Sequence, residues 1–148
     1  MTLGPNANGR FEDRWVRMVE EARSNCLFTR GIGEIELPVR HGEGRLIAGD
    51  GSIGELVGQG LVPLRYASPA GEPTEVYPHN PNGSPQGAAA LCNPAGTVLG
   101  LMPHPEAYHH RTNHPRWTRL PDLPDEGAGL RIFRNAYGYL AGSDIAAV

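Results

Sequence analysis

The most informative stretch of the sequence is TVLGLMPHPE, residues 97 to 106. It begins as an apolar segment with a β-branched start, Thr97 to Met102, and this composition predicts a strand. The strand runs directly into a proline-flanked pair of titratable residues, His104 and Glu106. Active-site groups collect at strand ends in α/β folds, so the pattern indicates a candidate site at the end of this strand.

His104 and Glu106 stand two positions apart, and in extended backbone such residues project to the same side. The flanking prolines stiffen the backbone around them. A carboxylate beside an imidazole fixes its tautomer and stabilises the imidazolium, which is the base and orienting half of a nucleophilic triad. A purely structural or surface pair is the alternative, because the nucleophile remains to be found.

The rest of the chain alternates short apolar segments with turn chemistry. Pro94, Ala95 and Gly96 suit a hairpin between Thr97 to Met102 and the preceding apolar segment. Four further segments read as strands by their length and apolar content: Ala88 to Leu91, Ile35 to Val39, Arg45 to Ala48 and Leu61 to Tyr66.

Two segments have helical spacing. Gly51 to Gly58 carries Ser52 as an N-cap and three apolar residues on one face. Gly129 to Leu140 has Leu130, Phe133, Tyr137 and Leu140 at helical spacing, with Gly142 as a stop. Asn8 to Glu20 fits either period, and on its pattern alone we favour a helix.

A second candidate site is the loop His41-Gly42-Glu43-Gly44, in which His41 and Glu43 could line a pocket and bind substrate. Its alternative is a solvated turn. The segment PHNPNGSP, residues 78 to 85, is turn chemistry throughout. It reads as a long surface turn, with a substrate-facing loop as the alternative.

A zinc site is a rival interpretation of the region around His104. Four of the six histidines and one carboxylate gather there: His104, Glu106, His109, His110 and His114. Their spacing does not match known structural zinc sites, and a proline-interrupted surface loop explains them equally well. We therefore expect neither a metal nor another cofactor.

The composition bounds the function. A chain of 148 residues fits one domain or a large piece of one. A net charge of −3 argues against nucleic-acid binding, and no apolar stretch is long enough to span a membrane. The two cysteines, Cys26 and Cys92, have no metal-binding spacing and predict buried thiols in a reducing cytoplasm.

Taken in order, the motifs resemble one family. NGRFEDRWV, SNCLFTRGI, LPVRHGEG, YPHNPNGSPQG, VLGLMPHPE and IFRNAYGYL are similar to successive signatures of the class I glutamine amidotransferases, specifically the glutaminase component of phosphoribosylformylglycinamidine synthase. The resemblance runs from Asn8 to Leu140. It also changes the interpretation of residues 11 to 19, which form a strand of the central sheet in that family.

The resemblance implies an α/β fold of the flavodoxin-like kind, with a mixed central sheet flanked by helices. It implies a Cys-His-Glu triad that hydrolyses glutamine, in which His104 and Glu106 match the family's histidine and glutamate. The ammonia would pass to a synthetase partner during purine biosynthesis, so the whole enzyme is both hydrolase and ligase.

Neither cysteine of this sequence matches the family's nucleophile. The family places it in a Gly-x-Cys-x-Gly turn before the region matched here, and neither Cys26 nor Cys92 has flanking glycines in that arrangement. We expect residues 1 to 148 to be the C-terminal part of an amidotransferase domain, N-terminally truncated and inactive alone. Uncovered apolar surface then predicts a homo-oligomer. The alternative is a non-catalytic fragment that docks on a synthetase or self-associates.

Overall fold

The computed structural model describes residues 1–49 and 52–142. Strands and helices both occur, which confirms the α/β class. In chain order the elements are β1 (Thr2–Pro5), β2 (Glu12–Glu20), β3 (Glu34–His41), β4 (Glu43–Ile47), α1 (Ser52–Gly58), β5 (Leu64–Tyr66), the 3₁₀ helix η1 (Pro85–Gly87), β6 (Ala90–Cys92), β7 (Leu99–Leu101), the 3₁₀ helices η2 (Pro105–Ala107), η3 (Arg111–Asn113) and η4 (Trp117–Arg119), and α2 (Leu130–Ala141).

β2 is the central strand, so the helix favoured by pattern alone for residues 8 to 20 is wrong and the strand implied by the resemblance is confirmed. It pairs antiparallel with β3 on one edge and with β5 on the other. Val16 and Met18 are buried on one face, while Trp15 on the opposite face is covered by Tyr108. The other residues of that face, Asp13, Arg17 and Val19, are exposed or half-buried, so the two faces differ less in polarity than a simple alternation requires.

The predicted hairpin is confirmed. β6 and β7 pair antiparallel around the turn at Pro94 to Gly96, where Gly96 has a positive φ of 71°. β6 also lies beside β5, because the Ala89 N–H donates to the Leu64 carbonyl at 3.1 Å. The strand predicted from residues 97 to 102 is therefore present in shorter form and ends beside the main sheet.

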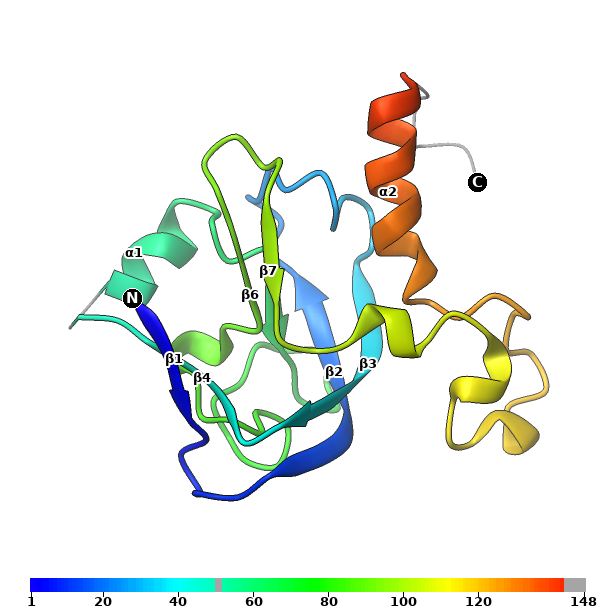
Figure 1. The fold of residues 1–148 in the computed structure, drawn as a ribbon, viewed down its shortest axis with the longest axis horizontal. Helices are drawn as coiled ribbons and strands as arrows, with labels where there is room; N and C mark the ends of the chain where they lie inside the picture. The colour runs from blue at the N-terminus through cyan, green and yellow to red at the C-terminus, as the bar shows by residue number, and fades with distance from the viewer. Residues whose placement is uncertain (50–51, 143–148) are drawn as a thin grey trace.

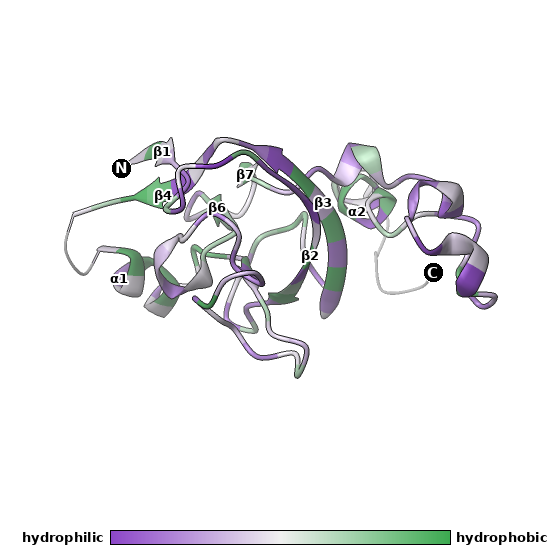
Figure 2. Cartoon of the chain, turned by 90° about the horizontal axis from the view of Figure 1, so that it is seen from below, coloured by the Kyte–Doolittle hydropathy of each residue, from purple (hydrophilic) through white to green (hydrophobic). Residues whose placement is uncertain are grey.

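The strands form three antiparallel groups: β3-β2-β5, β6-β7 and β1-β4. Figure 1 shows α1 with the β1-β4 pair on one side of the molecule and α2 on the other, with the hairpin between them. Seen from below, β2 and β3 are banded by hydropathy along their length (Figure 2). The main core lies against this sheet and includes Met18, Leu37 and Tyr66.

α1 covers a smaller core. Ile53 and Val57 are buried against Leu46 and Val62, as the predicted apolar face required. Gly51, where the predicted helix began, lies outside the described residues.

α2 ends at Ala141 and is capped by Gly142, as predicted, but the predicted apolar stripe is largely the solvent face. Phe133, Tyr137 and Leu140 are 47%, 74% and 83% exposed. The inner face is formed by Ile132, Asn135 and Gly138. Asn135 Nδ2 donates to the carbonyls of Phe28 and Arg30, each at 2.9 Å, so this helix is tied to the core by polar contacts as well as apolar ones.

Asn80, Pro81, Asn82 and Ser84 are buried, which corrects the surface turn expected for PHNPNGSP. Asn82 is fully buried, and its side-chain amide donates to the Gly44 carbonyl at 2.8 Å and to the Tyr66 hydroxyl at 3.0 Å. Its Oδ1 accepts from the backbone N–H and hydroxyl of Ser84. The polar side chains of this loop therefore form buried hydrogen bonds to β4 and β5 instead of facing solvent.

The predicted loop at residues 41 to 44 is a sharp bend. β3 ends at His41 and β4 begins at Glu43, so Gly42 alone separates them. The bend is needed because β3 pairs with β2, whereas β4 leaves that sheet to pair with β1. In the described part of the chain, no helix is both long and apolar enough to cross a membrane.

Candidate active site

His104 and Glu106 lie side by side where β7 ends. His104 Nδ1 is 2.6 Å from Glu106 Oε1. The side chains are 38% and 61% exposed, so both can be reached from solvent. The contact predicted from their spacing is confirmed, while their catalytic role stays a prediction.

The backbone around His104 is held by two neighbouring elements. Its N–H donates to the Pro38 carbonyl of β3 at 2.8 Å. Residues 105 to 107 then form η2, which begins with a proline and presents Glu106 in its first turn. On the other side, the Gly129 N–H donates to the Tyr108 carbonyl at 2.9 Å, which brings the start of α2 against the turn.

The local charges keep Glu106 ionised. Burial of the carboxyl acts to raise its pKa. The hydrogen bond from His104, a backbone hydrogen bond and the charges of His104 and Arg40 lower the pKa, and together they outweigh the effect of burial. The pKa of Glu106 is therefore below its ordinary value. An ionised carboxylate only accepts hydrogen bonds, so the proton between the two side chains belongs to Nδ1 of His104.

This tautomer leaves Nε2 of a neutral His104 with a free lone pair. An imidazole whose Nδ1–H is held by a carboxylate can take a proton at Nε2 and have the resulting charge stabilised. The pair has the geometry of the base and orienting members of a triad.

Three aromatic residues, Trp15, Tyr108 and His114, pack together next to this turn. The sequence analysis did not identify them as a group. Tyr108 and Trp15 meet edge to face with ring centroids 4.9 Å apart, and His114 lies 4.9 Å from Trp15. His114 is buried, with Nε2 3.5 Å from a carboxylate oxygen of Glu36. The contact between Trp15 and Tyr108 could not be predicted from the sequence, because more than 90 residues separate them.

The histidines of this region serve separate contacts. His104 bonds Glu106, His110 caps η3 through Thr112, and His114 packs in the interior. Across the described ranges, no three His, Cys, Asp or Glu residues are grouped in a way that could hold a metal ion.

Both cysteines lie at the opposite end of the hairpin from His104. Cys92 pairs with Leu99, the first residue of β7, whereas His104 follows the end of that strand. Cys26 sits at the hairpin turn, since the next residue, Leu27, donates its N–H to the Gly96 carbonyl at 3.0 Å. Cys26 is buried, and burial raises the pKa of the Cys92 thiol. Neither thiol therefore stands beside the His104 imidazole.

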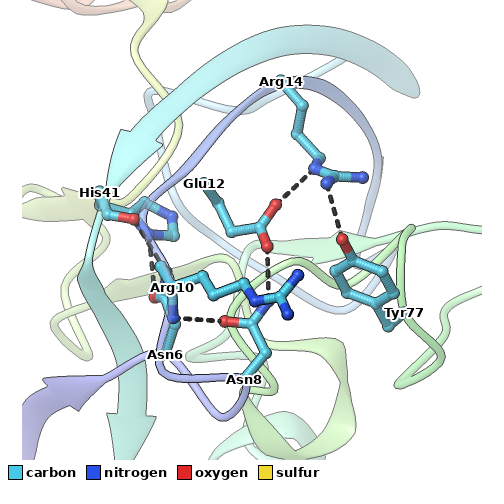
Figure 3. A network of polar contacts seen from close by, with 7 residues as sticks. All are labelled: Asn6, Asn8, Arg10, Glu12, Arg14, His41 and Tyr77. Atoms are coloured by element: carbon cyan, nitrogen blue, oxygen red, sulfur yellow. Dashed lines mark hydrogen bonds and ion pairs between the residues drawn. The ribbon is translucent and has the colours of Figure 1, made fainter.

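The second candidate pair, His41 and Glu43, is not brought together. His41 is buried with its Nδ1 3.0 Å from Asn6 Oδ1 (Figure 3), whereas Glu43 is exposed at the start of β4. The two residues do not form a common binding surface. Asn6, which holds His41, was not identified from the sequence because its partner is 35 residues away.

Comparison with known proteins identifies the family of this chain. The family model for the CobB/CobQ-like glutamine amidotransferase domain matches residues 1–140. The chain belongs to this family. The match covers nearly the whole of this chain, in agreement with the resemblance seen in its motifs.

Curated relatives of this amidotransferase domain include the phosphoribosylformylglycinamidine synthase subunit PurQ of Dehalococcoides mccartyi, which is 39% identical over 136 residues. That match covers 92% of this chain and 51% of the relative. The phosphoribosylformylglycinamidine synthase of Dictyostelium discoideum is 37% identical over 145 residues, covering 90% of this chain and 10% of that protein. The chain spans about half the length of the PurQ relatives that it matches.

A solved structure has the same fold. The structure of PurLQS from Thermotoga maritima matches with a TM-score of 0.64 and 27% sequence identity, covering 94% of this chain and 52% of that chain. This match confirms the amidotransferase-like α/β fold.

Proposed function

We propose that the chain is the C-terminal part of a glutaminase that releases ammonia from glutamine for formylglycinamidine ribonucleotide synthesis in purine biosynthesis. The observation that carries the proposal is the hydrogen-bonded pair of His104 and Glu106 in a homologue of PurQ. His104 acts as the base toward a cysteine nucleophile, and Glu106 orients it. No cofactor is required for this chemistry.

In this proposal the nucleophile comes from outside these 148 residues. Cys26 and Cys92 are remote from His104 along the hairpin, which supports a thiol supplied by a polypeptide equivalent to the unmatched half of the relatives. The chain alone is then inactive. In this proposal it works in the cytoplasm, where unpaired thiols persist.

The partner is a synthetase subunit that receives the ammonia, as the PurLQS assembly of the structural relative suggests. Glutamine is the substrate. We propose that Glu43, which is exposed at the start of β4, contributes to binding the ammonium group of glutamine through its negative charge. His41 was the other predicted substrate-binding residue, but its buried ring favours an indirect contribution to this site.

The test is complementation. The purified chain is mixed with the part of the D. mccartyi subunit that this chain does not match, and ammonia release from glutamine is measured. We expect no turnover from either piece and turnover from the mixture, which His104→Asn abolishes. Turnover by the chain alone that Cys26→Ser or Cys92→Ser removes would overturn the proposal by revealing a different nucleophile.

A non-catalytic interaction module is the second candidate, and two apolar surfaces favour it. One is the exposed stripe of α2 formed by Phe133, Tyr137 and Leu140. The other is an apolar groove of about 410 Å³ between β1, β4 and the hairpin, lined by residues that include Leu3, Leu46 and Leu101. Contiguous exposed apolar surface marks sites of association, so we propose that the isolated chain forms a homo-oligomer.

A further inference from the structure

The two cysteines of this chain have no part in the proposed function, yet they lie in the same region of the fold. Cys26 belongs to the connection between β2 and β3, residues 21 to 33, and is 1% exposed. Cys92 is the last residue of β6 and is half-buried. Both thiols are free. Because they are far apart in the sequence, only the tertiary structure can bring them together.

The connection that carries Cys26 runs along the turn of the β6-β7 hairpin (Figure 1). The Leu27 N–H donates to the Gly96 carbonyl at 3.0 Å. A Cβ built on Gly96 would lie 2.4 Å from the carbonyl oxygen of Asn25 and 3.2 Å from Cα of Cys26. The backbone of residues 25 to 27 therefore lies directly against the turn that follows Cys92.

Gly60 joins Cys92 to the same connection from another side. The Cys92 N–H donates to the Leu61 carbonyl at 2.9 Å, and Sγ of Cys92 is 3.9 Å from the Gly60 carbonyl oxygen. A Cβ built on Gly60 would lie 3.3 Å from Cα of Ser24. Gly60 therefore contacts both Cys92 and the residue two positions before Cys26.

The two thiols meet in this packed region. The Cys92 thiol forms hydrogen bonds with the side chains of Ser24 and Cys26. The Cys26 N–H donates to the same Ser24 hydroxyl at 3.3 Å, which keeps the three side chains together. A disulfide requires two cysteines whose backbones are already close, because the bond tolerates little distortion. The contact of the two thiols meets this requirement.

We propose that Cys26 and Cys92 form a reversible, oxidant-sensitive disulfide site whose co-reactant is a low-molecular-weight disulfide such as glutathione disulfide. Cys92, the more exposed of the two, attacks one sulfur of the oxidant as a thiolate, and the other glutathione leaves as a thiolate. Cys26 then attacks Sγ of Cys92 and releases the second glutathione. The two protein thiols lose two electrons and two protons, and the oxidant is reduced to two glutathione thiols.

The environment of Cys92 makes the first step slow at neutral pH. Burial raises the pKa of its thiol, so only a small fraction is the reactive thiolate. Oxidation should therefore become faster as the pH rises from neutral. The completed bond closes a long loop that contains β3, β4, α1 and β5. Closing such a loop restricts the unfolded chain, so the oxidised protein should be the more stable form.

The test is a redox titration of the full chain. The folded protein is equilibrated with mixtures of glutathione and glutathione disulfide, free thiols are blocked by alkylation, and the protein is examined by mass spectrometry before and after digestion without reduction. We expect both thiols to be lost together, the mass to decrease by two hydrogen atoms, and one peptide to contain Cys26 joined to Cys92. Dithiothreitol should reverse the change. The melting temperature of the oxidised chain should be at least about 5 °C higher.

Two variants separate the steps. Cys26→Ser should stop at a mixed disulfide of Cys92 with one glutathione, because the second attack is lost. Cys92→Ser should leave Cys26 unmodified, because that thiol is buried. Wild-type protein that retains glutathione on Cys92, that forms disulfides only between chains, or that keeps both thiols free in mixtures that oxidise the urea-unfolded chain would overturn the inference. The readout needs no glutaminase activity, so it is independent of the proposed function.

Discussion

Gly129 and Tyr108 meet backbone to backbone. The glycine N–H donates to the Tyr108 carbonyl at 2.9 Å, and a Cβ built on Gly129 would lie 2.6 Å from that same oxygen. The carbonyl oxygen of Pro105 is also in the way. The start of α2 can therefore approach the His104 turn only because residue 129 has no side chain.

Gly129→Ala should destabilise the protein by about 1–3 kcal/mol, because backbone atoms must move apart to admit the methyl group. Urea denaturation measures the loss. Gly54→Ala is the control, since Gly54 lies in α1 with nothing within 4 Å of a new Cβ. That substitution should stabilise by up to about 1 kcal/mol through helix propensity. Equal effects of the two changes would contradict the close approach.

Glu106→Gln should lower kcat for ammonia release in the complemented enzyme by about 10²–10⁴-fold, because His104 loses the carboxylate that orients it. KM should change little. Arg40→Gln is the comparison, since Arg40 acts on Glu106 through its charge alone and should alter kcat much less. A Glu106→Gln enzyme with normal kcat would show that another group orients the imidazole.

His41 should make stability depend on pH. Its folded pKa is lowered from 6.5, so below that pH the unfolded chain binds a proton that the folded chain refuses. Stability should therefore decrease as the pH falls from 6.5 toward the lowered folded pKa. His41→Asn should flatten this part of the curve of unfolding free energy against pH, whereas His109→Asn, at an exposed site, should leave it unchanged.

Asn82→Ala should cost about 2–5 kcal/mol of stability, because it strands several buried polar groups at once. The Gly44 carbonyl, the Tyr66 hydroxyl and the Ser84 N–H each lose a partner. Gln59→Ala, at an exposed position after α1, should change stability by less than about 0.5 kcal/mol. Thermal melts of the two variants would separate a buried network from an ordinary surface loop.

Tyr137→Glu should weaken self-association of the isolated chain at least about tenfold, because it places a charge in the middle of the apolar stripe. Tyr139→Glu is the matched control on the same helix, outside the stripe. Sedimentation equilibrium measures both. A wild-type chain that stays monomeric across micromolar concentrations would rule out the proposed homo-oligomer.

The sequence was most informative where signals were local. The strand before His104, its contact with Glu106 and the hairpin turn at Gly96 all follow from neighbouring residues, and the structure contains them. β2 could not be recognised from periodicity, because Trp15, Met18 and Val19 fit helical spacing as well as a strand. The role of Asn6 was also out of reach, since its hydrogen bonds to His41 depend on how β1 and β4 come together.

The outward stripe of α2 shows a different limit. Phe133, Tyr137 and Leu140 have the spacing of a core-facing helix, yet the core selects the face with Ile132 and Asn135. An apolar pattern on a helix predicts that this face is buried. It does not tell whether the face packs against the same chain or against another one.

The contacts of α2 also set the time at which the chain can finish folding on the ribosome. Arg131 donates to the carbonyl of Ile32, a residue made 99 positions earlier. At ordinary rates of synthesis the segment around Ile32 waits about 5–20 s for this partner. During most of that interval β2 and β3 are complete but lack their contacts with α2. A nascent chain arrested before residue 131 should therefore be a preferred substrate for chaperones and proteases.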